Sequence, residues 1–317
     1  MAEVSVIIPT ENSADNLDAL LLSIFTQSEQ DTEIILVDNV SDDETLHLLE
    51  RYRQFDKRVQ VIKLKEKTSL TECCRIGMKK ATAPYVYFMN GTKYVYLAQG
   101  CLARLLLNIR TFDSDFVYST CLVVDAVNWT PLPFYQIKPE NFVGKNVFNA
   151  GDIAADLLFR LYLTPWGKLY KKEFLEEMNF APYEESFFLE CLLRAKKITY
   201  DLANLYIYHM QPYGLVRKNV TAEEDMNAEL LHKYGVFEKY KTAYIYHKMR
   251  CLWLNVMFAP TEEQRRLFEE MKAAFADEDF SEYDMHMLGK EDLYMAIVNT
   301  KRIGFEEFSK LYLGRAA

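Results

Sequence analysis

The stretch YVYFMNGTK, residues 85–93, joins an apolar run to a polar cluster. Three earlier apolar runs also end in polar or charged residues: VSVII (4–8) before Pro9-Thr10-Glu11-Asn12, EIILV (33–37) before Asp38-Asn39, and VQVIKL (59–64) before a lysine-rich loop. Short runs rich in Val, Ile and Tyr are typical of strands that are buried on both faces. The sequence therefore predicts a series of buried β-strands, each of which ends in polar side chains.

The segments between these runs have the spacing of amphipathic helices. The clearest case has apolar residues at positions i, i+3, i+4, i+7 and i+8, namely Leu17, Leu20, Leu21, Ile24 and Phe25. Ser41 with Glu44, and Ser69 with Glu72, fit the capping box that opens a helix. This regular alternation of strand and helix predicts right-handed crossovers and an α/β fold built on a parallel sheet.

The end of the fourth run lacks the acids that would hold a metal ion. Ligands of an open parallel sheet bind outside the carboxyl ends of its strands. Here that end offers the amide of Asn90, the hydroxyl of Thr92 and the ammonium of Lys93. Divalent cations prefer carboxylate oxygens, so Lys93 is the candidate that would meet a negatively charged ligand directly. The alternative is that Lys93 is an ordinary solvated lysine.

Several ordered motifs resemble those of one enzyme family. VSVIIPTENS, LLLSIFTQ, EIILVDNVSDDET and KKATAPYVYFMNGTK look like the N-terminal half of a family-2 glycosyltransferase with the GT-A fold. WGKLYKKEFL (166–175) and YEESFFLECLLRAKKITYDLANLYIYHMQP (183–212) look like the second half. The resemblance implies a Rossmann-like, mainly parallel sheet flanked by helices. It also implies transfer of a sugar from a nucleotide-sugar to a glycan or lipid-linked acceptor in surface polysaccharide synthesis.

The resemblance assigns roles to residues at matching positions. The family's Glu-Asp pair, whose Asp is the base in inverting members, falls on Glu184 and Glu185, which implies Glu185 as the general base. The positions that would bind the donor are Pro9, Thr10, Glu11, Asp38, Asn39, Asn90, Thr92, Lys93 and His209. Trp166 and Lys168 would lie on the acceptor side.

The chain departs from the family pattern at the positions that carry chemistry. The family's Asp-x-Asp metal motif falls on Asn90, Gly91 and Thr92. Glu11 stands where the family has an aromatic residue, and Asn39 where it has a second acid. We therefore expect no cofactor and a transfer that does not depend on a metal, although Mg²⁺ or Mn²⁺ stays open.

Each of these roles has a structural alternative. Asp38 could form a turn with the residues before Ser41, and Glu185 could simply complement a helix N-terminus. His209 could reach donor phosphates or be a satisfied structural histidine. The literal Asp113-Ser114-Asp115 triplet precedes the run 116–124, so we expect it to form a turn away from the ligand edge.

Composition sets outer limits on function. A net charge of −9 argues against nucleic-acid binding through a broad basic surface. The six cysteines lack CxxC spacing, and no signal peptide or bilayer-length apolar stretch is recognised. We expect a cytoplasmic protein, with attachment to the inner face of the membrane left open and the oligomeric state unassigned. None of the five histidines has metal-ligand spacing with a Cys or carboxylate cluster.

The pattern changes near residue 215. We expect a nucleotide-sugar-binding and acceptor domain over 1–215, in which 126–150 is a loop excursion, and a helical region over 216–317. The helical region should begin with one long helix over 221–258, capped by Thr221 and stopped before Pro260. Further helices are expected near 261–276, 290–299 and 304–313. The apolar stripe of Tyr244, Met249, Trp253, Met257 and Phe258 should form core between helices; the alternative is a stripe that faces a membrane or a partner.

Two hypotheses of different classes follow. The first is an active glycosyltransferase, favoured by Asp38, the Glu184-Glu185 pair and the 166–170 segment. The second is a non-catalytic GT-A module that binds a ligand or serves as the partner subunit of an active transferase. The missing acids at 90–92 favour the second hypothesis.

Overall fold

A computed structural model describes residues 2–125, 146–155, 158–161, 163–210, 217, 219–280, 295 and 298–314. The chain forms two compact units. The first comprises Met1–Ile153 and Leu161–Met210, and the second comprises Ala154–Arg160 and Gln211–Ala317. Most of the expected loop excursion at 126–150 lies outside the described residues.

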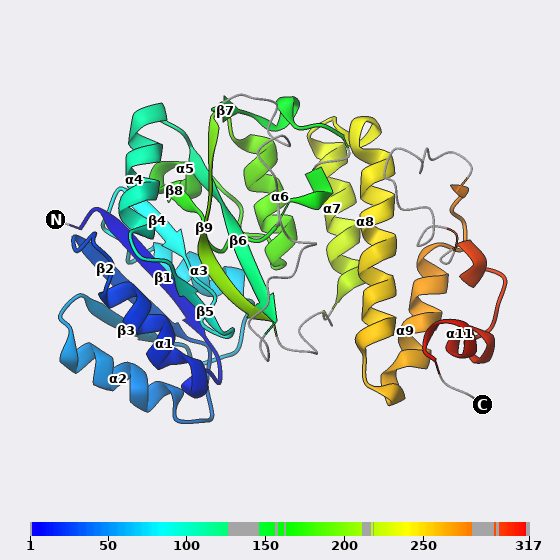
Figure 1. The fold of residues 1–317 in the computed structure, drawn as a ribbon, viewed down its shortest axis with the longest axis horizontal. Helices are drawn as coiled ribbons and strands as arrows, with labels where there is room; N and C mark the ends of the chain where they lie inside the picture. The colour runs from blue at the N-terminus through cyan, green and yellow to red at the C-terminus, as the bar shows by residue number, and fades with distance from the viewer. Residues whose placement is uncertain are drawn as a thin grey trace. The chain divides into compact units, whose positions relative to one another are not determined.

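The first half of unit one alternates strand and helix, as the sequence predicts (Figure 1). Its elements in chain order are β1 (Val4–Thr10), α1 (Ala14–Phe25), β2 (Thr32–Asp38), α2 (Thr45–Phe55), β3 (Val59–Lys63), α3 (Leu70–Met78) and β4 (Tyr85–Phe88). Strand β1 pairs in parallel with both β2 and β4, and β2 pairs in parallel with β3. The predicted α/β fold with a mostly parallel sheet is therefore confirmed.

The second half of unit one completes the same sheet. Its elements are β5 (Val95–Leu97), α4 (Cys101–Phe112), β6 (Phe116–Asp125), β7 (Val147–Phe148), the 3₁₀ turn η3 (Ala150–Asp152), β8 (Leu169–Lys171), α5 (Lys172–Glu176), α6 (Glu184–Arg194) and β9 (Ile198–Met210). The strand order is β3-β2-β1-β4-β8-β6-β9-β5, and β7 pairs with β9.

The strand directions define a single ligand edge. Strand β8 is antiparallel to both β4 and β6, and β6 is parallel to β9. Strands β6 and β9 therefore run in the same direction as β1 to β4. Their carboxyl ends meet at one edge of the sheet, which is where an open α/β sheet binds its ligands.

Burial explains why these segments form strands and helices. Every residue of β1 and β2 is buried, as expected of strands covered on both faces. Helix α1 buries Leu17, Leu20, Leu21 and Ile24, whereas Phe25 is half-buried. Helix α3 packs on β1 and β2, and α4 packs on β9. The hydrophobic periodicity thus identifies the helix faces that meet the sheet.

The two predicted helix caps have different outcomes. The hydroxyl of Ser69 accepts a hydrogen bond from the Glu72 backbone N–H at 3.2 Å, so Ser69 is confirmed as the N-cap, but the Glu72 carboxylate binds Arg75 at 2.6 Å instead of completing the capping box. The Ser41 cap is wrong, because α2 begins only at Thr45 with Glu44 as its N-cap residue. The Ser41 hydroxyl instead donates to the Asp38 carboxylate at 2.6 Å. The Ser41 hydroxyl that would cap the helix is therefore bound to the carboxylate three residues earlier in the chain.

The Asp113-Ser114-Asp115 triplet forms the expected turn. Asp113 ends α4 with a left-handed φ of 51°. The Asp115 carboxylate accepts backbone N–H groups of Lys196 and Lys197 at 2.7 and 3.0 Å. Because Asp115 precedes β6, it lies at the amino end of that strand, opposite to the ligand edge.

Unit two is helical over its described residues. It contains the 3₁₀ turn η4 (Leu158–Arg160), α7 (Val220–Lys233), α8 (Phe237–Phe258), α9 (Thr261–Ala274) and α11 (Phe305–Tyr312). The single helix predicted over 221–258 is wrong, because Gly235 adopts a φ of +66° between α7 and α8. The N-cap of α7 is Asn219 rather than Thr221. The predicted helices over 261–276 and 304–313 match α9 and α11, and most of 290–299 lies outside the described residues.

The apolar stripe on α8 is core over most of its length, but not at its end, because Met257 is half-buried and Phe258 is 39 % exposed. Tyr244, Met249 and Trp253 are buried. The Trp253 ring meets the Phe308 ring of α11 edge-on, with centroids 5.2 Å apart. Along the described part of the chain, no helix combines the length and apolar character needed to span a bilayer.

Candidate functional site

The ends of β1, β2 and β4 are joined by backbone hydrogen bonds at the ligand edge. The Asn39 N–H donates to the Thr10 carbonyl at 2.8 Å, and the Gly91 N–H donates to the Pro9 carbonyl at 3.0 Å. Residues predicted from three separate stretches of sequence therefore lie together.

The loop after β4 is shaped by its own residues and by α1. A Cβ atom on Gly91 would lie 2.5 Å from the Pro9 carbonyl oxygen, so only glycine fits this approach. The Asn90 amide oxygen accepts the Thr92 N–H at 3.0 Å and the Thr92 hydroxyl at 2.7 Å. The Asn16 amide donates to the carbonyls of Gly91 at 2.9 Å and Lys93 at 2.6 Å. The close approach of Gly91 to Pro9 and these hydrogen bonds together define the shape of the loop.

Glu11 and Asn39 form a second hydrogen-bonded group at this edge. The Asn39 amide donates to the Glu11 carboxylate at 2.7 Å and to the Thr68 carbonyl at 3.0 Å. Its amide oxygen accepts the Thr68 N–H at 3.0 Å. The Lys67 ammonium binds the same Glu11 carboxylate at 2.8 Å, which raises the pKa of Lys67. The amide at Asn39 is needed here, because a carboxylate in its place could not donate to Glu11.

Lys67 is a site residue that sequence reasoning did not single out. The only signal was its place in the lysine-rich loop after the third run, which holds Lys65 and Lys67 without distinguishing between them. The partner that distinguishes Lys67 is Glu11, which lies 56 residues earlier in the chain.

Asp38 has the turn contacts that we set out as its alternative role. Its carboxylate accepts the Ser41 hydroxyl at 2.6 Å and the Ser41 N–H at 3.3 Å. The residue is only 2 % exposed. Asp38 therefore closes the β2–α2 turn at the ligand edge, and any contact with a ligand would be made by a carboxylate already held in place.

Lys93 and His209 are brought close together by the strand pairing. Lys93 is exposed, and within the described ranges no carboxylate is at ion-pair distance from it. The His209 N–H donates to the Tyr94 carbonyl at 2.8 Å, which places the end of β9 beside the β4–β5 loop. The His209 Nε2 and the Tyr96 hydroxyl are 2.9 Å apart. Burial lowers the pKa of His209, so its neutral form is favoured.

The Glu184-Glu185 pair opens α6. Both acids lie in its first turn, where the helix dipole stabilises negative charge. The Trp166 indole N–H donates to the Glu184 carboxylate at 2.6 Å. Glu185 is 7 % exposed, so it is not turned to bulk solvent.

Tyr206 of β9 is a buried aromatic residue of unit one. Burial raises the pKa of Tyr206, and electrostatic interactions with Cys121 and Glu184 add to that shift. The same tyrosine is hydrogen-bonded to the Asn90 backbone.

Lys168 lies beneath the site instead of facing an acceptor. Its side chain is 0 % exposed, and its ammonium donates to the Trp166 carbonyl at 3.0 Å. The nitrogen lies 4.8 Å from the Tyr118 ring centroid and 4.7 Å from that of Phe188. Burial lowers the pKa of Lys168 to about 7. The expected acceptor-side role does not fit this placement, and Lys168 instead positions Trp166.

The sequence model of glycosyl transferase family 2 matches residues 5–178. Cholesterol galactosyltransferase of Borreliella burgdorferi is 25% identical over 271 residues, which are 76% of this chain and 71% of that protein. Poly(ribitol-phosphate) beta-N-acetylglucosaminyltransferase TarP of Staphylococcus aureus is 24% identical over 225 residues, which are 66% of this chain and 63% of that protein.

A solved structure has the same fold. The crystal structure of S. aureus TarS 1-349 in complex with UDP matches with a TM-score of 0.64 at 16% identity, and covers 99% of this chain and 91% of that chain. Its complex with UDP-GlcNAc matches with a TM-score of 0.56 at 18% identity, and covers 95% and 92%. At such identities the likeness shows a shared fold.

Proposed function

The chain belongs to the glycosyl transferase family 2, and from this membership we propose that it transfers a sugar from a nucleotide-sugar to a glycan or lipid-linked acceptor. The names of two relatives, one for cholesterol and one for poly(ribitol-phosphate), support acceptors of these classes. TarS binds UDP and UDP-GlcNAc, which supports a nucleoside diphosphate sugar as the donor. Surface polysaccharide synthesis at the inner face of the membrane is the process we propose.

The observation that carries this proposal is the loop of residues 89–93. It presents Lys93 at the ligand edge on a backbone held by Asn16 and by close contact with Pro9. A diphosphate leaving group gains negative charge as the glycosidic bond breaks. A positive charge that is already in place stabilises that transition state without reorganisation. We assign this role to Lys93, so transfer would proceed without a divalent cation.

Glu185 is the proposed general base, and the proposed role of Glu184 is to hold Glu185 in position. Its low exposure at the start of α6 is compatible with a carboxylate that faces a crevice. A base must approach the proton it removes to within about 3 Å, or act through one water. The Trp166 hydrogen bond to Glu184 fixes the first turn of α6, and thereby the position of Glu185.

Donor binding with and without metal tests the proposal. A thermal-shift screen identifies the nucleotide-sugar that raises the melting temperature, and calorimetry then measures its Kd in EDTA and in Mn²⁺. We expect equal affinity in both buffers, and sugar transfer by the wild type in EDTA. Lys93→Ala should weaken the diphosphate ligand about 10–150-fold, the equivalent of roughly 1.5–3 kcal/mol for a charge-assisted contact, and leave the nucleoside unchanged.

The control is Lys80→Ala, which removes a positive charge from another exposed position. Affinity that disappears in EDTA would contradict the metal-free mechanism. If Lys93→Ala weakened the binding of the nucleoside and of the diphosphate ligand equally, the role assigned to Lys93 would be refuted.

A non-catalytic GT-A module is the second candidate. Two acids at the ligand edge already have partners within the protein, which favours this candidate: Glu11 binds Lys67, and Asp38 binds Ser41. Nucleotide-sugar binding without transfer to any glycan or lipid acceptor would support this candidate over the enzyme.

A further inference from the structure

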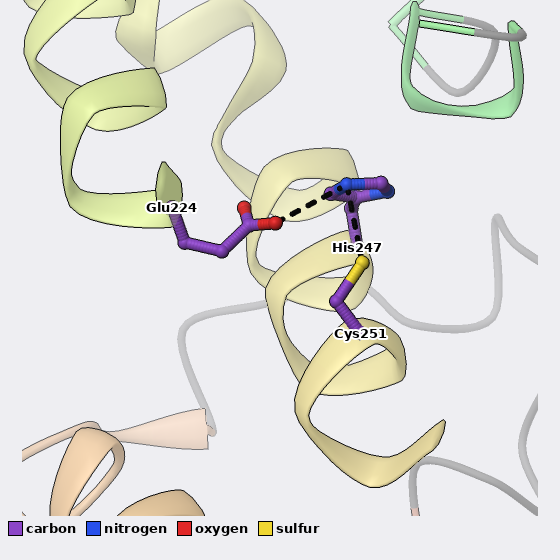
Figure 2. A group of neighbouring side chains, drawn as sticks. All are labelled: Glu224, His247 and Cys251. Carbon is purple, nitrogen blue, oxygen red and sulfur yellow. Dashed lines mark hydrogen bonds and ion pairs between the residues drawn. The ribbon is translucent and has the colours of Figure 1, made fainter. Parts of the chain in front are cut away.

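Three side chains with metal-binding atoms converge inside unit two. Glu224 comes from α7, and His247 and Cys251 come from α8 (Figure 2). The His247 Nε2 lies 3.3 Å from a Glu224 carboxylate oxygen and 3.4 Å from the Cys251 Sγ. One ligand atom from each residue lies within 4.8 Å of the other two. No histidine shows metal-ligand spacing in the sequence, and these three side chains come together only through the fold.

The spacing on α8 explains how sequence inspection missed this group. His247 and Cys251 are four residues apart, so they share one face of the helix. Glu224 is 23 residues before His247, on a helix that the turn at Gly235 folds back against α8. The third ligand therefore becomes visible only when α7 and α8 are recognised as two helices.

Glu224 is buried in a way that requires compensation. Its side chain is 0 % exposed, and among the described residues neither carboxylate oxygen accepts a hydrogen bond of good geometry, although His247 Nε2 lies 3.3 Å away. The contact with His247 is an ion pair only if the imidazole is protonated. A buried carboxylate without adequate partners is unfavourable, so such groups are paired or bind metals.

We propose that Glu224, His247 and Cys251 bind one Zn²⁺ ion. Carboxylate oxygen, imidazole nitrogen and thiolate sulfur together are ligands of zinc. Bonds of about 2.0–2.1 Å to N and O, and about 2.3 Å to S, place neighbouring ligand atoms of a tetrahedral site roughly 3.3–3.6 Å apart. The two separations of 3.3 and 3.4 Å at Nε2 fit this range.

Charge also balances in this site. Binding replaces the thiol proton of Cys251 by the metal and releases that proton to solvent. The carboxylate and the thiolate then carry two negative charges, which neutralise the dication. Three protein ligands leave the fourth tetrahedral position for a water molecule.

Two positively charged arginines lie next to the proposed ligands and should weaken the binding of a cation. The Arg217 guanidinium lies 3.3 Å from the Cys251 Sγ, and the Arg250 guanidinium lies 3.4 Å from the His247 Nδ1. Because a guanidinium can only donate, the Nδ1 of His247 accepts, and the imidazole proton is on Nε2. Zinc at Nε2 moves that proton to Nδ1, so Arg250 must turn away. Removal of the Arg250 charge should therefore tighten binding.

The ion would join α7 to α8. A ligand that binds only the folded state raises its stability. Zinc should thus raise the melting temperature of the protein, and a chelator should lower it, without any change in the ligand edge of the sheet.

Cobalt spectroscopy on the full chain without an affinity tag tests the site. After chelator treatment and dialysis, Co²⁺ is added, and a thiolate-to-cobalt charge-transfer band with tetrahedral visible bands is expected at one ion per chain. Zn²⁺ competition then gives the zinc affinity. Cys251→Ala should abolish the charge-transfer band, and Glu224→Gln should weaken zinc binding at least about 10–100-fold. The matched control is Cys101→Ala, at another buried cysteine, which should keep the band.

Arg250→Gln keeps all three ligands and provides a test that does not depend on the folding of the ligand variants. It should bind zinc more tightly than the wild type. A wild type that binds no stoichiometric Co²⁺ or Zn²⁺, a band that persists in Cys251→Ala, or weaker binding by Arg250→Gln would each overturn the proposal.

Discussion

Lys168→Met should change how the stability of the protein depends on pH. Lys168 is fully buried, and burial lowers its pKa from 10.5 to about 7. Between these values the unfolded chain binds a proton at this side chain that the folded chain does not. The free energy of unfolding therefore rises with pH across this window. The stability gained at high pH is lost again as the pH falls toward 7.

The magnitude follows from the shift in pKa. A difference of this size corresponds to about 5 kcal/mol over the whole window. The Tyr118 and Phe188 rings act in the opposite direction, since a cation beside an aromatic face gains about 0.5–2 kcal/mol. Full burial outweighs this gain, because it removes the ammonium from all of its bulk water. We therefore expect Lys168 to raise the wild-type free energy of unfolding by roughly 1–2 kcal/mol between about pH 7.5 and pH 9.5.

Urea denaturation at both pH values measures the effect. The wild-type free energy of unfolding should rise with pH relative to that of Lys168→Met, which has no proton to lose. Raised thiol pKa values, such as that of buried Cys101, act in both proteins and largely cancel in the comparison. Lys80→Met, at an exposed position, controls for the loss of one positive charge. Parallel pH dependences of the wild type and Lys168→Met would refute the reasoning.

Two further predictions concern the ligand edge. Gly91→Ala should lower the free energy of unfolding by about 1–3 kcal/mol and weaken nucleotide-sugar binding, because its Cβ would lie 2.5 Å from the Pro9 carbonyl oxygen; urea denaturation should show a smaller loss for Gly304→Ala, whose added Cβ meets nothing within 4 Å. Glu185→Gln keeps the shape of the side chain and removes the base, so kcat for sugar transfer should fall about 10²–10⁴-fold while the donor Kd, measured by calorimetry, is retained; undiminished transfer would refute the assignment.

The fold was predictable because its signals are local and repeated. The runs at 4–8, 33–37 and 85–89 carry their own burial pattern, and the helices between them carry the 3.6-residue period. The strand directions then follow from short crossovers, which leave few alternatives. The prediction of a helix cap failed where one side chain had two possible hydrogen-bond partners. Ser41 could cap a helix or bind Asp38, and only the folded turn decides for Asp38.

The site was less predictable because its contacts join distant parts of the chain. Sequence motifs identify Trp166 and Lys168 as neighbours, but they do not show that Lys168 points inward and Trp166 toward Glu184. Lys67 and Glu11 are 56 residues apart, so neither indicates the other. The break at Gly235 was missed because a glycine is tolerated within a helical pattern, and its positive φ becomes known only from the backbone.

The proposed metal-free transfer follows from the charges of one loop. In the family pattern, two aspartates and a dication sum to zero net charge at the end of the fourth strand. Here Asn90 and Thr92 are neutral and Lys93 carries one positive charge, so this loop presents a net charge of +1 to a diphosphate without any ion. Two aspartates left without their cation would repel the leaving group, whereas this set attracts it. The loop also keeps its shape, because Asn90 binds Thr92 and Asn16 holds the carbonyls of Gly91 and Lys93. Hydrogen bonds within the protein thus hold the backbone that would present Lys93 in the proposed mechanism.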